Sequence, residues 1–483
     1  MFKNNLLSDK APNLKDRILR WGAFALFFAY FWHTYQIFTD IPAYRDALEV
    51  VWGILWYNHA LTEWVNPFHY PLIFHPEGWQ VGILAHTPLI FMVSQPFYIL
   101  GGEVFAYNML AIIPFFISYS GALRFFKHYT KSPLTLIAVS LAFTFVAMRT
   151  SRVGGHLHIL WATSFLPWLG YHLNHWREQD EKSIWNTNVV MSGIYFGLMV
   201  GFSLYSIFLA PIAFFLLERK LFQWRKIPQL ILTGTIALLI GSTALLPYLW
   251  ATRNESIESP GIQSLTFWGA SINNLFVPSI FHSLDFVRNF SNSLQGGGGG
   301  EARSLNMGLM TLFLAVIGLY YVWRQPKNRL GHVFVFIVGC LFSLGPLLKY
   351  NAEPLQVDSL GWLNEVLWGW GRAIKPDVFK SDLAPTQYLK GIPLPSYLFI
   401  IFVPFWEGAR TVARFAMVAF LGALGLAAEG LDRLPRWLGL FLMIIWLIEM
   451  LPIQTGSERL VFDTLHPAHE WLIAQPMEPG KGI

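Results

Sequence analysis

The 483-residue chain is too apolar for an ordinary soluble domain, because hydrophobic residues make up 54% of it and charged residues only 13%, against about 25% charged residues in soluble domains. Its only cysteine, Cys340, excludes an intramolecular disulfide and a cysteine metal cluster. The net charge of +5 does not indicate a nucleic-acid partner, since the lysines and arginines gather in short loops between apolar runs. The composition predicts an all-α integral membrane protein.

The N-terminal part alternates between a charged lead, an apolar run and a mixed segment. Residues 1–20 are basic and are predicted to be cytoplasmic. Residues 21–38 form the first predicted span, since about 20 apolar residues cross the hydrocarbon core of a bilayer. Residues 38–103 mix acids, histidines and aromatic rings, a pattern typical of the membrane–water boundary. We therefore expect a first extracytoplasmic loop with interfacial helices, one of them over residues 44–64, where apolar residues recur at helical spacing.

Two apolar runs follow residue 87, and only the second, which begins after the loop, is long enough to span. Residues 88–101 are short and contain Pro96, and a run of 10–14 residues is more often interfacial or re-entrant. We treat it as non-spanning, which places Lys127 in the cytoplasm. The predicted fold is then a bundle of about 11 transmembrane helices within a domain of residues 21–452. The expected spans are 21–38, 104–125, 134–148, 157–173, 188–204, 206–217, 230–249, 307–323, 333–348, 412–428 and 437–450.

The positions of the basic residues predict the topology of these spans. Every short loop assigned to the cytoplasm carries lysine or arginine, as the positive-inside rule requires. The chain is therefore expected to cross the plasma membrane of a bacterium several times, with its N-terminus cytoplasmic and its C-terminus extracytoplasmic. The tail, residues 453–483, reads like the start of a soluble extracytoplasmic domain.

Several short stretches together resemble the GT-C superfamily of membrane glycosyltransferases, the class of the protein O-mannosyltransferases and the aminoarabinose-lipid A transferases. The resemblance covers most of the chain, from about Trp21 to Ala428, and depends on the order and spacing of the motifs. These are TDIPAY, LWYNHAL with NPF, FHPEGW with HTPL, AYN, GGHLHILWATSFLPW, FVPSIFH, FSLGPLL and ARTVARF.

This resemblance implies a helical bundle with a lipid-facing groove and an enzyme that transfers a sugar on the extracytoplasmic side. The donor would be a polyprenyl-phosphate-linked sugar, and no divalent metal or other cofactor is expected. An acidic residue early in the first external loop acts at the reaction centre of the superfamily, and Asp40 stands at that position here. Asp46 and Glu49, one and two helical turns further on, are secondary acidic candidates.

The acidic candidates each have a second interpretation. A carboxylate such as Asp40 can take the proton that an acceptor hydroxyl or amine loses as it attacks the sugar. Asp40 could instead cap the helix that begins near residue 43. Asp46 and Glu49 are three residues apart and share one helix face. The same spacing is expected if they simply form a helix face that is exposed to water.

Arg149 and Arg152 follow an apolar run at its predicted outer end. Arginine suits a bidentate contact with the phosphate of a lipid donor, although snorkelling to lipid headgroups explains the same position. His156 and His158 lie beside them as candidate substrate-binding residues. Since two histidines two residues apart point to different faces of a helix, we expect no metal site there.

Three further residues complete the candidate phosphate- and substrate-binding set. Arg410 and Arg414 are four residues apart and are expected to share one helix face at the outer membrane edge, where they would bind phosphate or anchor to lipid. His86, in the first loop, is a candidate for the edge of the acceptor site, although an interfacial histidine without a binding role is the alternative.

A non-catalytic function is the rival to the enzyme. The chain could be a transporter, or a GT-C-like scaffold subunit with partner proteins in a larger membrane complex. A transporter is expected to show broken helices and ionisable residues at mid-membrane, and few such residues occur in the predicted spans. The expected partners of the enzyme are the lipid-linked donor and membrane lipids.

Overall fold

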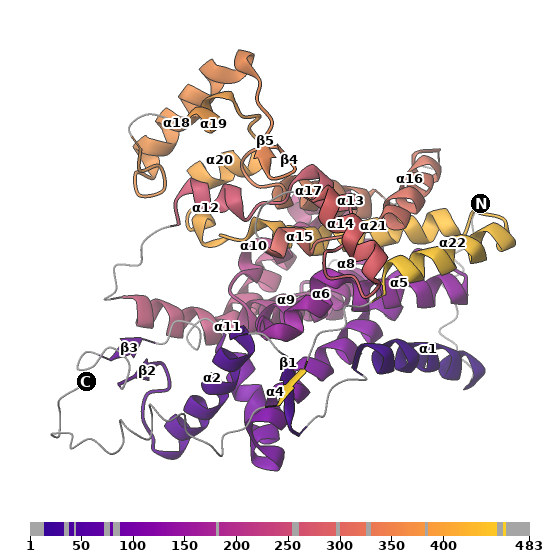
Figure 1. The fold of residues 1–483 in the computed structure, drawn as a ribbon, viewed down its shortest axis with the longest axis horizontal. Coiled ribbons are helices and arrows are strands. Elements are labelled where there is room, and N and C mark those ends of the chain that lie inside the picture. The colour runs from indigo at the N-terminus through magenta and orange to yellow at the C-terminus, as the bar shows by residue number, and fades with distance from the viewer. Residues whose placement is uncertain are drawn as a thin grey trace.

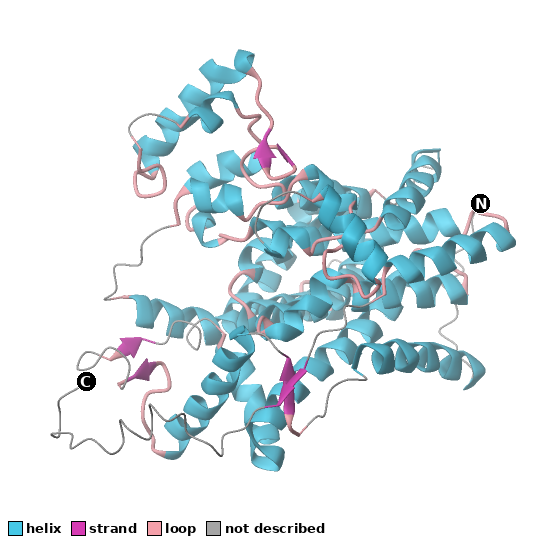
Figure 2. Cartoon of the chain, in the orientation of Figure 1, coloured by secondary structure: helices cyan, strands magenta, loops and turns pink. Residues whose placement is uncertain are grey.

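The computed structural model describes residues 14–32, 38–42, 45–71, 78–80, 87–179, 183–253, 260–295, 300–324, 330–381, 385–451 and 457–459. This part of the chain is mostly helical (Figure 2), and its strands form three antiparallel pairs, β1–β6, β2–β3 and β4–β5. The predicted all-α class is therefore confirmed for the described residues.

The N-terminal third packs around one long helix (Figure 1). α4 (Pro88–Phe126) bends at Gly101 and Gly102, whose backbone angles are not helical. The bend separates the two apolar runs that the sequence distinguishes, and Gly102 supplies it at φ 79° because it has no Cβ. α1 (Leu14–Trp32) packs along α4 through aromatic rings, and α2 (Arg45–Thr62), the predicted loop helix, packs on it as well.

The other helices are α5 (Pro133–Phe145), α6 (Ala147–Thr150), α7 (Leu157–Ser164), α8 (Leu166–Glu178), α9 (Thr187–Phe202), α10 (Ser206–Ala213), α11 (Ile227–Thr252), α12 (Ile262–Phe267), α13 (Ile272–Phe276), α14 (Asp285–Leu294), α15 (Gly300–Arg303), α16 (Leu309–Arg324), α17 (Gly331–Ser343), α18 (Gly361–Ile374), α19 (Thr386–Lys390), α20 (Pro395–Phe402), α21 (Ala416–Leu431) and α22 (Arg436–Glu449).

The 3-10 helices are η1 (Ser151–Gly154), η2 (Phe214–Phe222), η3 (Trp224–Lys226), η4 (Asp358–Leu360), η5 (Trp406–Gly408) and η6 (Val412–Phe415). The strands are β1 (Asp40–Pro42), β2 (His69–Tyr70), β3 (Trp79–Gln80), β4 (Lys349–Tyr350), β5 (Glu353–Pro354) and β6 (Ser457–Arg459).

Every predicted span overlaps helix within the described residues, although several of the predicted bounds differ from the helix ends; α17, for example, ends at Ser343 and not at residue 348. Four segments of the described chain are long and apolar enough to cross a membrane, by length and composition, which supports the membrane assignment. The total of about 11 spans stays a prediction. The four segments are Pro88–Phe126, Pro133–Gly154, Trp224–Ala251 and Val412–Leu431.

α21 lies at the centre of the C-terminal half, and nearly all of its side chains are buried. Its glycines allow neighbouring backbones to come close, as small residues do in membrane helix interfaces. A Cβ added at Gly430 would collide with the Leu314 carbonyl oxygen of α16, and one added at Gly422 would lie 2.5 Å from the His332 carbonyl oxygen of α17. The sequence GALGLAAEG therefore fixes α21 between α16 and α17.

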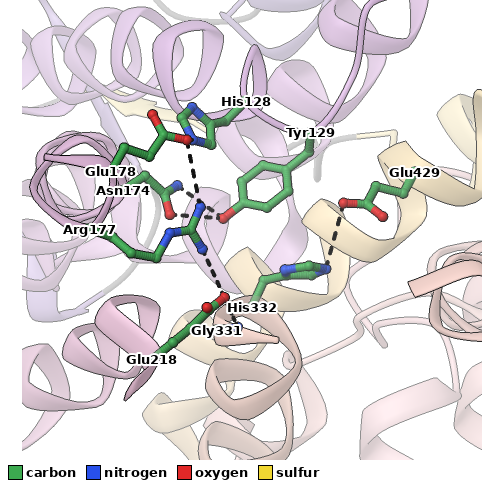
Figure 3. A network of polar contacts seen from close by, with 9 residues as sticks. All are labelled: His128, Tyr129, Asn174, Arg177, Glu178, Glu218, Gly331, His332 and Glu429. Atoms are coloured by element: carbon green, nitrogen blue, oxygen red, sulfur yellow. Dashed lines mark hydrogen bonds and ion pairs between the residues drawn. The ribbon is translucent and has the colours of Figure 1, made fainter. Parts of the chain in front are cut away.

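A network of polar side chains joins the ends of several helices (Figure 3). Nε2 of His128, after α4, lies 2.7 Å from Oε1 of Glu178 at the end of α8. Arg177 donates from Nη1 to Oε1 of Glu218 in η2 at 2.9 Å, and the same oxygen accepts the Gly331 amide of α17 at 2.9 Å. One carboxylate thus connects α8, η2 and α17. We call this side of the bundle the network end.

The end of α21 also reaches the network end. Nε2 of His332 lies 4.0 Å from Oε1 of Glu429, and Oδ2 of Asp432 accepts from Thr130 Oγ1 at 2.7 Å and from the Lys131 amide at 3.0 Å. All these helix ends are ones that the charge pattern assigns to the cytoplasm. The structure therefore places them together on one side, as an alternating bundle requires.

Asp40 lies at the opposite end, which we call the Asp40 end. Tyr119 Oη donates to the Arg20 carbonyl at 2.9 Å near the start of α1, and Nδ2 of Asn108, three turns earlier in α4, donates to the Asp40 carbonyl at 2.8 Å. α1 thus runs antiparallel to α4. β6 pairs with β1, with Asp40 opposite Arg459, so this part of the C-terminal segment also lies at the Asp40 end.

Cysteine labelling tests the topology. On a Cys340→Ser background, a cysteine at Lys127 is expected to be shielded from an impermeant thiol reagent added to intact cells, because it lies at the network end. The matched control, Asp358→Cys, changes a side chain that is 86% exposed in the segment after α17 and is expected to be labelled. Labelling at Lys127 would mean that residues 88–101 cross the membrane after all.

The Glu218 carboxylate should make a measurable contribution to stability. Glu218→Ala leaves the buried Arg177 guanidinium without this partner and the Gly331 amide without its acceptor, so we expect it to lower the free energy of unfolding by about 3 kcal/mol. Asp358→Ala removes an exposed pair with Lys390 and is expected to cost less than about 1 kcal/mol. Equal melting temperatures for the two variants in detergent would contradict a structural role for this network.

Candidate functional site

Asp40 opens strand β1, and its backbone is fixed on two sides. β6 pairs with the strand on one side, and the Asn108 amide of α4 holds the Asp40 carbonyl on the other. Thr39 Oγ1 donates to Asp40 Oδ1 at 2.8 Å, and Asp40 is only partly buried. Fixed main chain and partial exposure are what a carboxylate needs if it is to meet a substrate.

Consecutive residues of α4 connect Asp40 to the segment between α5 and α7. Asn108 binds the Asp40 carbonyl, and Tyr107 Oη donates to the Val153 carbonyl of η1 at 2.5 Å. Both side chains are fully buried. Tyr107 and Asn108 belong to the AYN stretch, one of the motifs behind the family resemblance, but the sequence alone indicated no role for them.

The start of α2 docks on the same segment. Gly155 has a φ of +129°, and a Cβ there would collide with the Asp46 side chain and lie 2.6 Å from its carbonyl carbon. Nε2 of His156 lies 3.8 Å from Oδ2 of Asp46, and the His156 and His158 rings are 5.9 Å apart. Asp40, Asp46, His156 and η1 therefore form one assembly at the Asp40 end.

Glu49 lies one turn further along α2. Burial raises the pKa of its carboxyl, and the nearby negative charge of Asp46 raises it further. Glu49 thus keeps its proton to a higher pH than an ordinary glutamate.

Arg149 and Arg152 are both buried, although the sequence predicts them at an outer surface. The Arg149 guanidinium donates to Thr163 Oγ1 at 2.8 Å and to Ser164 Oγ at 2.9 Å. It therefore holds α6 against the end of α7. Arg152 Nε donates to the Met148 carbonyl at 3.1 Å. The phosphate-binding role of either residue stays a prediction, and Arg149 is already committed to contacts inside the bundle.

Arg410 and Arg414 do not lie on one regular helix, contrary to the expectation from their spacing. Arg410 follows η5, Arg414 lies in η6, and α21 begins only at Ala416. Arg410 lies over the Trp268 ring at 5.5 Å, and Arg414 over the Tyr205 ring at 5.3 Å. A four-residue spacing gives a shared face only within an α-helix, so the two guanidinium groups have different neighbours.

Two further predictions concern His86 and metal ions. His86 lies outside the described residues. Within the described residues, no group of three or more histidine, cysteine, aspartate or glutamate side chains is arranged to hold a metal ion.

A second feature is a cleft of about 440 Å³ beside β4 and β5, lined in part by Gln263, Lys349 and Glu353. Lys349 is buried, and its Nζ donates to the Thr266 carbonyl in the last turn of α12 and to the Gly269 carbonyl just after that helix. Burial lowers the pKa of its ammonium group to about 8. These contacts make Lys349 a cap for the end of α12.

Comparison with known proteins assigns the chain to a family. A model of a domain of unknown function, DUF6311, matches residues 20–375. The chain belongs to the DUF6311 family. The DUF6311 match includes Asp40, Tyr107, Asn108 and the Arg149–His158 segment.

The remaining comparisons do not assign an activity to the DUF6311 chain. No curated protein sequence matches it. Among solved structures it is similar to the crystal structure of ArnT from Cupriavidus metallidurans in the apo state, with 13% sequence identity and a TM-score of 0.41. The match covers 87% of this chain and 78% of that chain. This similarity is too low to establish a shared activity.

The contact between Gly155 and Asp46 provides a test of this site in the DUF6311 protein. Gly155→Ala is expected to push the start of α2 away from η1, because both the φ angle and the added Cβ are unfavourable. Overpacking of this kind typically costs about 1–3 kcal/mol, which thermal unfolding in detergent would detect. Gly408→Ala is the control, since a Cβ there meets no atom within 4 Å. An unchanged melting temperature for Gly155→Ala would contradict the close docking of α2.

Proposed function

We propose that this chain is a membrane glycosyltransferase of the GT-C type, which moves a sugar from a polyprenyl-phosphate donor to an extracytoplasmic acceptor. The proposal rests mainly on two hydrogen bonds, made by Tyr107 and Asn108, that join the Asp40 strand to the Val153 segment. Segments more than a hundred residues apart in the chain are thereby held at one end of an apolar bundle. The resemblance of the surrounding motifs to the GT-C superfamily supports the same function.

Asp40 is the proposed general base. Its carboxylate accepts the proton of an acceptor hydroxyl or amine as that group forms a bond to the anomeric carbon. The bond between the anomeric carbon and the phosphate oxygen breaks at the same time, and the lipid phosphate leaves with the electron pair. Attack from the face opposite the phosphate inverts the anomeric centre. The acceptor nucleophile must therefore lie between Asp40 and the sugar.

The cationic groups at the Asp40 end are the proposed partners of the phosphate. Arg152 lies in η1, and His156 follows it at the start of α7. Arg414 is a further candidate at the head of α21. Positive groups that hold the leaving phosphate stabilise the charge that develops on it in the transition state. Arg149 is assigned a different role, since it fixes α6 and α7 from inside the bundle.

The membrane setting suits a lipid-linked donor. A polyprenyl chain stays in the bilayer, so its phosphate is presented at the membrane surface. We place the Asp40 end outside the plasma membrane of a bacterium and the network end in the cytoplasm, because the basic loops gather at the network end. The described part of the C-terminal segment would then be extracytoplasmic, and the N-terminus cytoplasmic.

Asp40→Asn tests the proposed base. The change removes the proton acceptor at nearly constant volume and keeps the backbone contacts with Asn108 and β6, so the protein should fold and still bind donor. Transfer is expected to fall by about 100-fold or more, measured as release of polyprenyl phosphate by protein in lipid nanodiscs. The control is Asp358→Asn, which changes an exposed carboxylate outside the candidate site and should keep most of the activity. Full turnover by Asp40→Asn would contradict the assignment of Asp40 as the general base.

The two buried arginines are expected to respond differently to substitution by lysine. Arg152→Lys keeps the charge but loses the planar guanidinium group, which can donate two parallel hydrogen bonds to a phosphate, so it should raise the KM for the donor. Arg149→Lys loses the paired contacts with Thr163 and Ser164, so it should lower the melting temperature and leave the KM of the folded protein unchanged. If only Arg149→Lys raised the KM, donor binding would have to be assigned to Arg149 instead of Arg152.

A further inference from the structure

Helix α18 carries an apolar stripe that the rest of the described protein does not cover. Trp362, Val366, Trp370 and Ile374 recur every fourth residue and lie on one face. All four are exposed, Trp362 by 68% and Trp370 by 49%. An exposed apolar stripe on a well-anchored helix marks an interaction surface.

The exposed half of α18 is itself divided into an apolar and a charged side. Glu365 and Arg372 are also exposed, but their positions on the helical wheel lie away from the stripe. Asn364, Leu367 and Trp368 face the protein. The helix therefore has one face for the protein, one for water and one for an apolar medium, the arrangement of an interfacial membrane helix.

The stripe continues into the apolar surface of helices next to it. The Trp370 ring lies 5.9 Å from the Phe402 ring of α20, and the Phe399 ring of α20 lies 4.8 Å from that of Phe342 in α17. α20 exposes Leu398, Phe399 and Phe402, and α17, an apolar helix of a predicted span, exposes Phe334 and Ile337. Exposed apolar side chains of α20 thus adjoin the stripe on α18, and α20 in turn packs on α17.

Polar contacts fix α18 in this position. Asn364 Nδ2 donates to the Leu389 and Gly391 carbonyls at 2.9 and 2.8 Å. After the helix, Lys375 Nζ lies 2.5 Å from Oε2 of Glu407 and donates to the Val403 carbonyl at 2.7 Å. The stripe is therefore held in a defined orientation before anything binds it.

We propose that α18 lies in the membrane–water interface with Trp362, Val366 and Trp370 among the lipids, so that the segment between α17 and α20 is a membrane-docking surface. The occupant is the lipid bilayer because the stripe adjoins the exposed apolar side of α20, which packs on the apolar helix α17. The stripe also presents tryptophans, which prefer the headgroup level. Glu365 and Arg372 remain in water.

Spin labels at single cysteines test the orientation in liposomes. On a Cys340→Ser background, labels at positions 362, 366 and 370 are expected to show a several-fold preference for collision with oxygen over a water-soluble nickel chelate, relative to labels at 365 and 372. The last two positions are matched controls on the same helix. Equal accessibility of all five labels to the nickel chelate would overturn the proposal.

A measurement on the unmodified protein guards against variants that fail to fold. In liposomes that contain a phospholipid with a diazirine in its acyl chain, illumination is expected to attach lipid to Trp362, Val366 or Trp370 and to leave Glu365 and Arg372 unmodified. Absence of adducts on α18, with adducts present on α17 or α20, would overturn the proposal. If lipid adducts on the stripe appeared only after the protein had been diluted with excess lipid, the occupant would be a second copy of the chain, and the proposal would be overturned.

Discussion

The hydrogen bonds that Tyr107 and Asn108 make hold the Asp40 end of the molecule together. Each side chain is fully buried and binds a backbone carbonyl, one in η1 and one at Asp40. A buried carbonyl without a partner is costly, so both segments are constrained to the position that α4 sets. α4 is in turn fixed by α1 and α2, which pack along it. The candidate carboxylate and the Arg152 segment thus depend on one helix for their relative placement.

The two ends of the bundle use their charged residues differently. At the network end, Glu218, Arg177 and Asp432 are engaged with one another or with backbone groups of neighbouring helices, so their charges serve packing. At the Asp40 end, the carboxylate of Asp40 and the ring of His156 are both partly exposed. Side chains that solvent can reach can also meet a substrate, which is why we propose the chemistry there.

Much of the fold could be predicted from the sequence, because an apolar run of membrane length has few alternatives to a helix. The α2 helix and the break before residue 104 also followed from local pattern. The roles of the candidate residues could not be predicted in the same way. Arg149 and Arg152 look equivalent in sequence, and only the arrangement of α6 and α7 shows that Thr163 and Ser164 bind the first. Tyr107 and Asn108 look like ordinary residues of an apolar helix, because their partners are distant in the chain.

The most direct test of the central claim is a cryo-electron microscopy map of the protein in lipid nanodiscs with a polyprenyl phosphate added. We expect phosphate density at the Asp40 end, beside η1 and the start of α7, with space for a sugar between the phosphate and Asp40. Asp40→Asn should show the same density, because the carboxylate is assigned to proton transfer and not to binding of the lipid. Phosphate density at the network end, or beside Asp40 with no space for a sugar, would contradict the proposed site.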